Sequence, residues 1–406
     1  MLITINDARK LILSGQCLLE KDKNQVVQVV SELAGIQYDP CPILHLNHYL
    51  VLWSRVPGFK VTDYDSIAYE ERELVEVSLF KRNLFIAPTC ELEIYNAATE
   101  RIVRWGTSRE QQRNERQSNN LLAEEEKLRQ AFYEMRSCTK HSLWEHLGLT
   151  EAWKTYRESG KQGLTRGYLP IFQVFYNMRL TNDIIVCNRL PGTFREPMFA
   201  LREHLRQDKS AVIEIDNIDA VELIVYKLVY SFGITDITHM KAITGLNSED
   251  ISTAIAALRV KELIADINVE GLKKTYIAAK KMLAVLEQRR VSDSEEVTLL
   301  SPMEGMIRDK RWLNTFFSYS FSFEYFKKKG MKWPLSILSQ NELAGFVDCG
   351  FDRKKKIFVV KEINIQKEKA VDMEGLYRSL CSLAGFHEAD ELVVFGKKYH
   401  GYHCKE

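Results

Sequence analysis

Residues 220–277 read AVELIVYKLVYSFGITDITHMKAITGLNSEDISTAIAALRVKELIADINVEGLKKTYI, and this stretch decides the fold class. It opens with an apolar run of helical length that ends at Gly233, and a shorter helical segment follows. Apolar residues then recur at helical spacing over Ser248–Ile264, behind an acidic first turn. Alternating residues on both sides of a Glu270-Gly271 turn indicate a β-hairpin. Three helices followed by a hairpin are typical of the winged helix, a helix-turn-helix with a β-wing.

The same order of elements recurs upstream, less regularly. In the middle of the chain, helices are predicted over Leu121–Arg136, Thr139–Leu147 and Gly167–Leu180. Wing strands are predicted at Ile184–Val186 and Phe199–Leu201, with a wing tip at Leu190-Pro-Gly192. The first hundred residues offer a divergent third copy, whose helical segments are Ile5–Leu19, Asn24–Gly35 and His48–Arg55.

Beyond about Val297, short segments rich in β-branched and aromatic residues replace the helical periodicity. The predicted strands are Val297–Leu300, Phe316–Phe326, Trp333–Leu338, Leu343–Phe351, Lys356–Ile365 and Glu391–Phe395, with a helix over Met373–Ala384. We therefore predict an α+β protein in which tandem winged-helix domains precede a small C-terminal β-barrel or sheet. The expected domains are residues 1–115, 116–212, 213–292 and 293–406.

Composition and charge limit the functions that the chain can have. Its 406 residues are 45% hydrophobic and 27% charged, as in ordinary globular proteins. The net charge of +1 excludes a strongly basic field, so a nucleic-acid surface has to be a local patch. Residues 301–370 contain 14 Lys and Arg against 8 Asp and Glu, whereas Asp63–Glu76 contains six acids and one Arg. Lysine-rich turns are equally well interpreted as phosphate contacts or as solvated turns.

The sequence predicts a reduced, cytoplasmic protein without a cofactor. No run of about 18 apolar residues occurs, and the N-terminus MLITINDARK lacks the apolar core of a signal peptide. The eight cysteines are scattered without a CxxC pair. No phosphate-binding loop, dinucleotide fingerprint or His-Glu-x-x-His motif occurs, and His45 and His48 lack a third ligand. We therefore expect neither a nucleotide cofactor, nor a metal, nor a membrane.

Candidate chemistry lies in Gln37-Tyr38-Asp39, directly before Pro40. Proline disfavours a helical conformation at the residue that precedes it, and in an extended chain residues two apart point the same way. Gln37 and Asp39 are therefore expected to present an amide and a carboxylate side by side, with Tyr38 facing the core. Such a pair could hold a water molecule, although a polar pair at a helix exit is more often a cap or turn.

These residues, and others in the same order along the chain, resemble the crosslink-repair DNA glycosylases of the YcaQ/AlkZ group. The resemblance implies tandem winged helices followed by a β-barrel, and a Gln-x-Asp catalytic motif that Gln37 and Asp39 match. The other matching stretches are Asp7-Ala-Arg9, Tyr49–Arg55, Glu73–Glu76, Leu300–Pro302, Asp309–Arg311 with Phe316 or Phe317, Phe323–Tyr325, Gly345–Asp348 and Asp352–Lys354.

The activity that this resemblance implies is that of a monofunctional DNA glycosylase. It would hydrolyse the N-glycosidic bond of cationic alkylated purines in duplex DNA, with alkylated guanine as the main candidate and interstrand crosslinks as a further one. A cationic base is already a good leaving group, so Asp39 would stabilise the developing sugar cation and accept a proton from water. Gln37 would orient that water or hold the backbone. An ionised Asp39 requires a neighbouring cation, for which Arg55 is the candidate.

Contacts to DNA are expected from seven residues, namely Arg55, His48, Lys81, Arg82, Arg353, Lys354 and Lys355. The chain departs from the family at Ser78–Leu84, where a His and a Glu are lacking, and at Ser301–Gly305. A non-catalytic winged-helix DNA-binding protein, either a regulator or a lesion binder, is therefore the alternative hypothesis.

Overall fold

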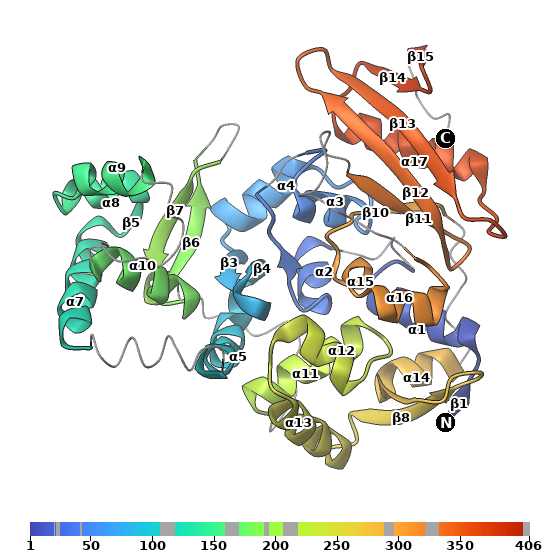
Figure 1. Ribbon diagram of the computed structural model, residues 1–406, viewed down its shortest axis with the longest axis horizontal. Coiled ribbons are helices and arrows are strands. Elements are labelled where there is room, and N and C mark those ends of the chain that lie inside the picture. Colours follow the sequence, from blue (N-terminus) through green and yellow to red (C-terminus); the bar gives the residue numbers. More distant parts are fainter. Residues whose placement is uncertain are drawn as a thin grey trace. The chain divides into compact units, whose positions relative to one another are not determined.

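The computed structural model describes residues 1–19, 21, 25–40, 43–105, 118–158, 170–190, 195–205, 218–287, 296–320 and 333–400. Helices and several sheets alternate along the chain, so the predicted α+β class is confirmed (Figure 1). The chain divides into two compact units. Unit 1 contains Met1–Asp63, Val225–Ile243 and Ser248–Glu406, and unit 2 contains Tyr64–Ile224 with Thr244–Asn247.

The N-terminal part of unit 1 is mainly helical. Its elements are β1 (Leu2–Ile3), α1 (Ile5–Gly15), α2 (Val26–Glu32), β2 (Ile36–Gln37), α3 (Asn47–Trp53) and α4 (Val61–Asp65), the last of which extends into unit 2. The start of α1 is fixed by a capping box, in which Thr4 and Asp7 each satisfy a backbone N–H of the other. The three helical segments predicted for this region are therefore present.

Residues 220–279 have the predicted order of elements. They contain α11 (Ala220–Ser231), α12 (Ile237–Thr244), α13 (Ser248–Val260) and the antiparallel strands β8 (Ile264–Val269) and β9 (Thr275–Ala279), and α14 (Lys280–Glu287) follows. One pairing was not predicted: β1 runs parallel to β8, with Leu2 opposite Asn268. The hairpin of unit 1 is thus extended to a three-stranded sheet by a strand from the N-terminus.

A six-stranded sheet forms the C-terminal part of unit 1, in the order β10-β11-β12-β13-β14-β15. Within the described residues this sheet stays open, so a closed barrel is absent there. The strands are β10 (Thr298–Leu300), β11 (Pro334–Ser339), β12 (Glu342–Asp352), β13 (Ile357–Ile365), β14 (Glu391–Val394) and β15 (Lys397–His400). Helix α17 (Met373–Phe386) packs Leu376, Leu380 and Leu383 onto one face of the sheet (Figure 1).

The strand predicted over Phe316–Phe326 is wrong in its first part. Phe316 and Phe317 instead end α16 (Lys310–Phe317), which follows the short helix α15 (Gly305–Arg308). The side chain of Asp309 caps α16 by accepting the backbone N–H groups of Arg311 and Trp312. Trp312, Leu313 and both phenylalanines then lie on one buried helical face. Residues 321–326 lie outside the described residues.

Unit 2 contains a second sheet, whose strands run in the order β4-β3-β6-β7-β5. The strands are β3 (Leu74–Ser78), β4 (Leu84–Pro88), β5 (Ser137–Thr139), β6 (Ile184–Arg189) and β7 (Pro197–Leu201). The α-helices are α5 (Leu92–Trp105), α7 (Ser118–Met135), α8 (Lys140–His146), α9 (Thr150–Glu158) and α10 (Pro170–Leu180). A short π-helix spans Ser66–Glu70, and short 3-10 helices span Phe80–Arg82, Thr89–Glu91 and Arg202–Leu205. Helices and strands are present where the sequence predicts them in this region, whereas residues 167–169 of the third predicted helix and the predicted wing-tip residues 191–192 lie outside the described residues.

The acidic stretch Asp63–Glu76 is partly neutralised inside unit 2. Glu76, 2% exposed, forms a two-pronged ion pair with Arg189 at 2.6 and 2.7 Å. Asp65 forms a similar pair with Arg195 at 2.7 and 2.8 Å. Part of this acidic cluster therefore joins the start of unit 2 to β6 and the residues before β7.

Two further features concern the whole described chain. None of its helices is both long enough and apolar enough to cross a membrane. Six cysteines fall in the described part, namely Cys17, Cys90, Cys138, Cys187, Cys349 and Cys381, and all six are free thiols.

Candidate functional site

The segment Gln37-Tyr38-Asp39 leaves helix α2 through two residues in the left-handed region, Ala34 at φ 55° and Gly35 at φ 94°. The chain then runs extended through β2 towards Pro40. Tyr38 is only 5% exposed, whereas Gln37 and Asp39 are half-buried. The predicted alternation is therefore present, with Tyr38 in the core and the amide and the carboxylate nearer the surface.

His48 is buried against Tyr38, the middle residue of this segment. Its ring stacks on that of Tyr38, with centroids 5.0 Å apart and planes 24° apart, and it also contacts the ring of Tyr49. The side chain is 0% exposed. This burial contradicts the prediction that His48 contacts DNA directly, because a buried ring cannot reach a phosphate. In the structure, the ring of His48 packs against that of Tyr38.

The backbone of Gln37 is held by a buried polar network. Asn47 Nδ2 donates to the Gln37 carbonyl at 2.9 Å, and Ser301 Oγ donates to Asn47 Oδ1 at 2.7 Å. The backbone N–H of Ser301 donates in turn to Glu304 Oε1 at 3.0 Å. The Ser301–Gly305 stretch, which departs from the family pattern, thus has a role in fixing the candidate site.

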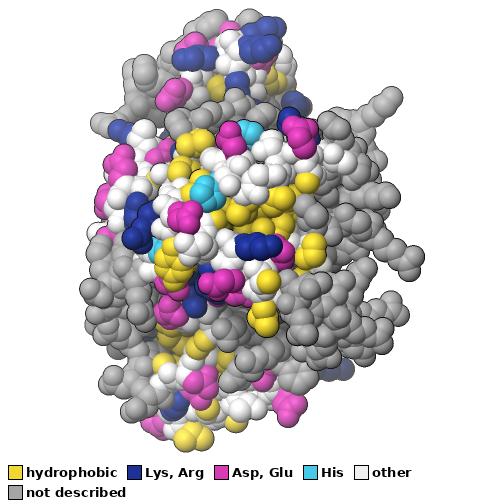
Figure 2. Space-filling model, turned by 90° about the vertical axis from the view of Figure 1, so that its left-hand side faces the viewer, with side chains coloured by type: hydrophobic (Ala, Val, Ile, Leu, Met, Phe, Trp, Pro, Cys, Tyr) yellow, Lys and Arg dark blue, Asp and Glu magenta, His cyan; other side chains and the backbone are white. Residues whose placement is uncertain are grey.

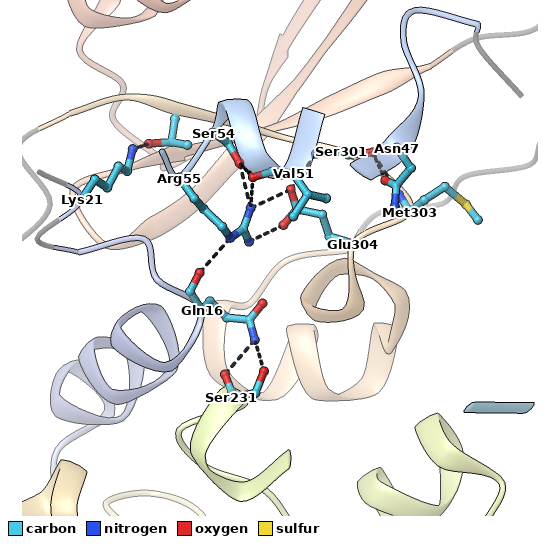
Figure 3. Close-up of polar contacts among 11 residues, drawn as sticks. Gln16, Lys21, Asn47, Val51, Ser54, Arg55, Ser231, Ser301, Met303 and Glu304 are labelled. Carbon is cyan, nitrogen blue, oxygen red and sulfur yellow. Dashed lines mark hydrogen bonds and ion pairs between the residues drawn. The ribbon is translucent and has the colours of Figure 1, made fainter. Parts of the chain in front are cut away.

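Arg55 closes the network on its other side. Its Nη2 lies 2.7 Å from Glu304 Oε2, and its Nε donates to the Gln16 carbonyl at 2.8 Å (Figure 3). The arginine and the glutamate are 1% and 2% exposed at their side chains. The charge of Arg55 is therefore engaged by Glu304 within the core, and this burial argues against its expected contact with DNA.

Arg308, the last residue of α15, is a cation that faces the candidate motif. Its Nη1 donates to Gln37 Oε1. Surrounding protein atoms desolvate the guanidinium and lower the pKa of Arg308, and the nearby Asp39 carboxylate opposes this effect. Sequence reasoning missed this residue. The available signal was its position directly before Asp309–Arg311, one of the stretches that resemble the family.

The basic turn between β12 and β13 is connected to the chain just beyond Asp39. Arg353 Nη2 donates to the Leu44 carbonyl at 3.0 Å. Asp352 Oδ1 accepts the backbone N–H groups of Lys354 and Lys355 at 3.1 and 3.2 Å, which shapes the turn. Arg353, Lys354 and Lys355 are all exposed. The structure therefore links this turn to Leu44, five positions after Asp39 in the chain, within unit 1.

The other predicted DNA contacts, Lys81 and Arg82, form the tip of the β3–β4 hairpin in unit 2. Both have left-handed backbones, at φ 52° and φ 60°. Lys81 is exposed and Arg82 half-buried. On the face that Figure 2 presents, the coloured acidic and basic side chains are interspersed. Among the side chains that Figure 2 colours, the cationic ones therefore occur as small groups.

The chemistry available at the Gln37–Asp39 segment consists of a carboxylate, an amide and a guanidinium. Within the described part of the chain, no group of three or more His, Cys, Asp or Glu side chains is arranged to hold a metal ion. The arrangement can stabilise positive charge and position a water molecule by means of its own side chains.

Comparison with known proteins identifies the family. The chain belongs to the AlkZ-like DNA glycosylases, because the model of that family, described as DNA glycosylase AlkZ-like, matches residues 30–386. The solved structure of the Streptomyces sahachiroi DNA glycosylase AlkZ is similar, with a TM-score of 0.67 and 12% sequence identity. That match covers 97% of this chain and 99% of the other, and at this identity it shows a shared fold. None of the curated proteins matches the chain.

Proposed function

We propose that this protein is a monofunctional DNA glycosylase that removes cationic alkylated purines from duplex DNA, in the cytoplasm. Alkylated guanine is the main proposed substrate, and interstrand crosslinks are a further candidate. The observation that carries the proposal is the placement of Gln37 and Asp39 on the outward side of an extended segment, with Arg308 against them. Membership of the AlkZ-like family supports the same activity.

The proposed reaction needs little from the protein beyond charge and position. An alkylated purine with a positive ring leaves the sugar without a general acid, and an oxocarbenium ion develops on the sugar. The Asp39 carboxylate would stabilise that ion and accept a proton from the attacking water. The Gln37 amide would hold the water or the DNA backbone. The proposal includes no lysine nucleophile, so strand cleavage is not expected.

Two basic turns are proposed to bind phosphate. Arg353, Lys354 and Lys355 lie in the turn that contacts Leu44, and Lys81 and Arg82 lie at the tip of the β3–β4 hairpin. The four expected domains, three of them winged helices, remain our interpretation of the chain. The three helices and hairpin between Ala220 and Ala279 support this interpretation most directly.

The test of this function is the release of modified base by wild type and by Asp39→Asn. Methylated duplex DNA is incubated with excess protein, and free base and alkali-labile abasic sites are measured. We expect the variant to react about 100- to 1000-fold more slowly, the usual effect of losing one pre-placed electrostatic group. Its DNA affinity should stay within about threefold of that of wild type. DNA binding without base release by wild type would support the non-catalytic binder instead.

A further inference from the structure

We infer that Arg308 is a positioning residue that fixes the polarity of the Gln37 amide, so that Gln37 is the donor of the site and Asp39 its acceptor. The inference rests on the proposed function and assigns separate roles to the two motif residues. A glutamine amide alone could serve either role, since it carries an acceptor oxygen at one end and a donor nitrogen at the other.

The chemistry of the guanidinium determines which end of the amide faces Arg308. A guanidinium has five N–H donors and no acceptor, so its partner has to be the carbonyl oxygen of Gln37. The structure has this arrangement, with Arg308 Nη1 donating to Gln37 Oε1. Within the part of the chain that the structure describes, no acceptor contacts Gln37 Nε2. The donor end of the amide is therefore left for a ligand.

The same buried network holds both partners of this contact. Asn47 fixes the carbonyl of Gln37, and Ser301 joins Asn47 to Glu304 (Figure 3). Glu304 directly precedes α15, whose last residue is Arg308. Gln37 and Arg308 are thus both connected to the same set of buried polar groups, all of which lie within unit 1. Such shared anchoring is what a fixed amide orientation requires, because either partner could otherwise rotate away.

A division of roles follows. Arg308 engages one lone pair of the Gln37 oxygen, and an amide oxygen is too weak a base to take the proton of the attacking water. The carboxylate of Asp39, with two oxygens and about four lone-pair sites, retains acceptor capacity beside any other partner. Gln37 Nε2 is suited to hold the water oxygen or an oxygen of the DNA backbone while Asp39 takes the proton.

A double-mutant cycle tests this assignment. Arg308→Met, Gln37→Met and the combined variant are compared in single-turnover base release, with DNA affinity measured separately. We expect Arg308→Met alone to lower the rate by roughly 10- to 100-fold. In the Gln37→Met background the same change should lower it by less than about threefold, since the amide that it positions is gone. Arg308→Lys, which keeps a cationic hydrogen-bond donor group at this position, should retain part of the rate that Arg308→Met loses.

Controls separate positioning from binding and folding. Arg311→Met removes an exposed cation at the start of the next helix and should leave rate and affinity unchanged. If Arg308 bound phosphate instead, the slope of log affinity against log salt would fall by about 0.9 in Arg308→Met. Additive losses in the cycle, or a changed salt slope, would overturn the inference.

A second measurement does not depend on activity. In protein labelled with ¹⁵N at glutamine, the side-chain NH₂ signal of Gln37 is the pair of peaks missing from Gln37→Met. We expect this group to be rigid in wild type, and shifted and more mobile in Arg308→Met. An unchanged signal refutes the inference whether or not wild type releases base. A wild type that releases no base, with the signal changed as expected, refutes only the proposed function.

Discussion

His239 is a single residue whose packing links the stability of unit 1 to pH. Its ring stacks on Trp312, with centroids 5.1 Å apart and planes 14° apart, and its Nδ1 lies 2.9 Å from Thr235 Oγ1. Burial lowers the pKa of His239 to about 4, because a charged ring would lose its water there. Asp309 and Asp236 partly oppose this shift, and Lys274 adds to it.

The sign of the resulting pH dependence follows from proton binding. Between the unfolded pKa of about 6.5 and the folded value, the unfolded chain binds more protons, so acid favours unfolding. We expect His239 to remove about 2 kcal/mol of folding free energy between pH 7 and pH 5. Denaturant unfolding of His239→Gln at both pH values should show a correspondingly smaller loss than wild type.

The exposed His141→Gln is the matched control for this measurement, because water solvates that ring in both the folded and the unfolded chain. It should reproduce the pH dependence of wild type. Parallel stability curves for wild type and His239→Gln would show that another group, such as the buried His387, dominates the acid response.

At the scale of elements, the β3–β4 hairpin has two charged residues in a left-handed backbone conformation that lysine and arginine rarely adopt. Consecutive left-handed residues in a tight turn are typically Asn-Gly, whereas this chain has Lys81 at φ 52° and ψ 29° and Arg82 at φ 60°. The backbone N–H of Arg82 still donates to the Leu79 carbonyl at 2.9 Å, so the turn is closed. A left-handed backbone at a residue other than glycine costs free energy, and such residues are often found at functional sites.

Replacing the pair by Lys81→Asn and Arg82→Gly separates stability from binding. We expect the free energy of unfolding to rise by about 1 kcal/mol, because the new residues favour this backbone. If both cations meet phosphate, affinity for duplex DNA should fall, and the salt slope should decrease by up to about 1.8. A more stable variant with unchanged affinity would remove this hairpin from the DNA interface.

The elements also show what a sequence can and cannot predict. The three helices and hairpin of residues 220–279 were predictable because their periodicities and turn residues are local. The aromatic run ending at Phe317 was mistaken for a strand, because aromatic residues favour both strands and buried helix faces. The pairing of β1 with β8 joins residues about 266 positions apart, and no local pattern encodes it.

The candidate site, too, was predictable from the sequence only in part. The outward placement of Gln37 and Asp39 followed from Pro40 and the alternation of an extended chain. The contact of Gln37 with Arg308 could not be predicted in this way, because the two residues lie 271 positions apart in the chain. Nor could residue type distinguish Arg55 from Arg308: one is buried against Glu304 and the other faces the motif, and only tertiary packing separates them.

At the scale of the whole molecule, unit 1 is assembled from distant parts of the chain. The end of α1 meets the end of α11 so closely that side chains are excluded at Gly15 and Gly233. A Cβ at Gly15 would collide with the Tyr230 carbonyl, and one at Gly233 with the Leu11 carbonyl. Gln16 Nε2 also donates to the Ser231 carbonyl at 2.7 Å (Figure 3). The end of α11 and the Gly233 turn therefore pack directly on the N-terminal helix.

Two glycines with nearly the same backbone test this contact. Gly233 and Gly58 have φ values of +63° and +67°, but no atom would approach a Cβ at Gly58 within 4 Å. We expect Gly58→Ala to cost about 1 kcal/mol from backbone strain alone. Gly233→Ala should cost at least about 3 kcal/mol, because main-chain atoms cannot yield. Equal losses in the two variants would mean that this helix contact contributes little to stability.

The hydrogen bond between Gln16 and Ser231 spans 215 residues, and this span matters during synthesis on the ribosome. At about 5–20 residues per second, the first helix emerges roughly 10–40 s before the segment against which it packs. For that interval α1, whose Ala8, Leu11 and Ile12 are buried in the folded chain, lacks its contact with Tyr230 and Ser231 at Gly15. The nascent chain is thus a natural client for chaperones that cover apolar segments until translation is complete.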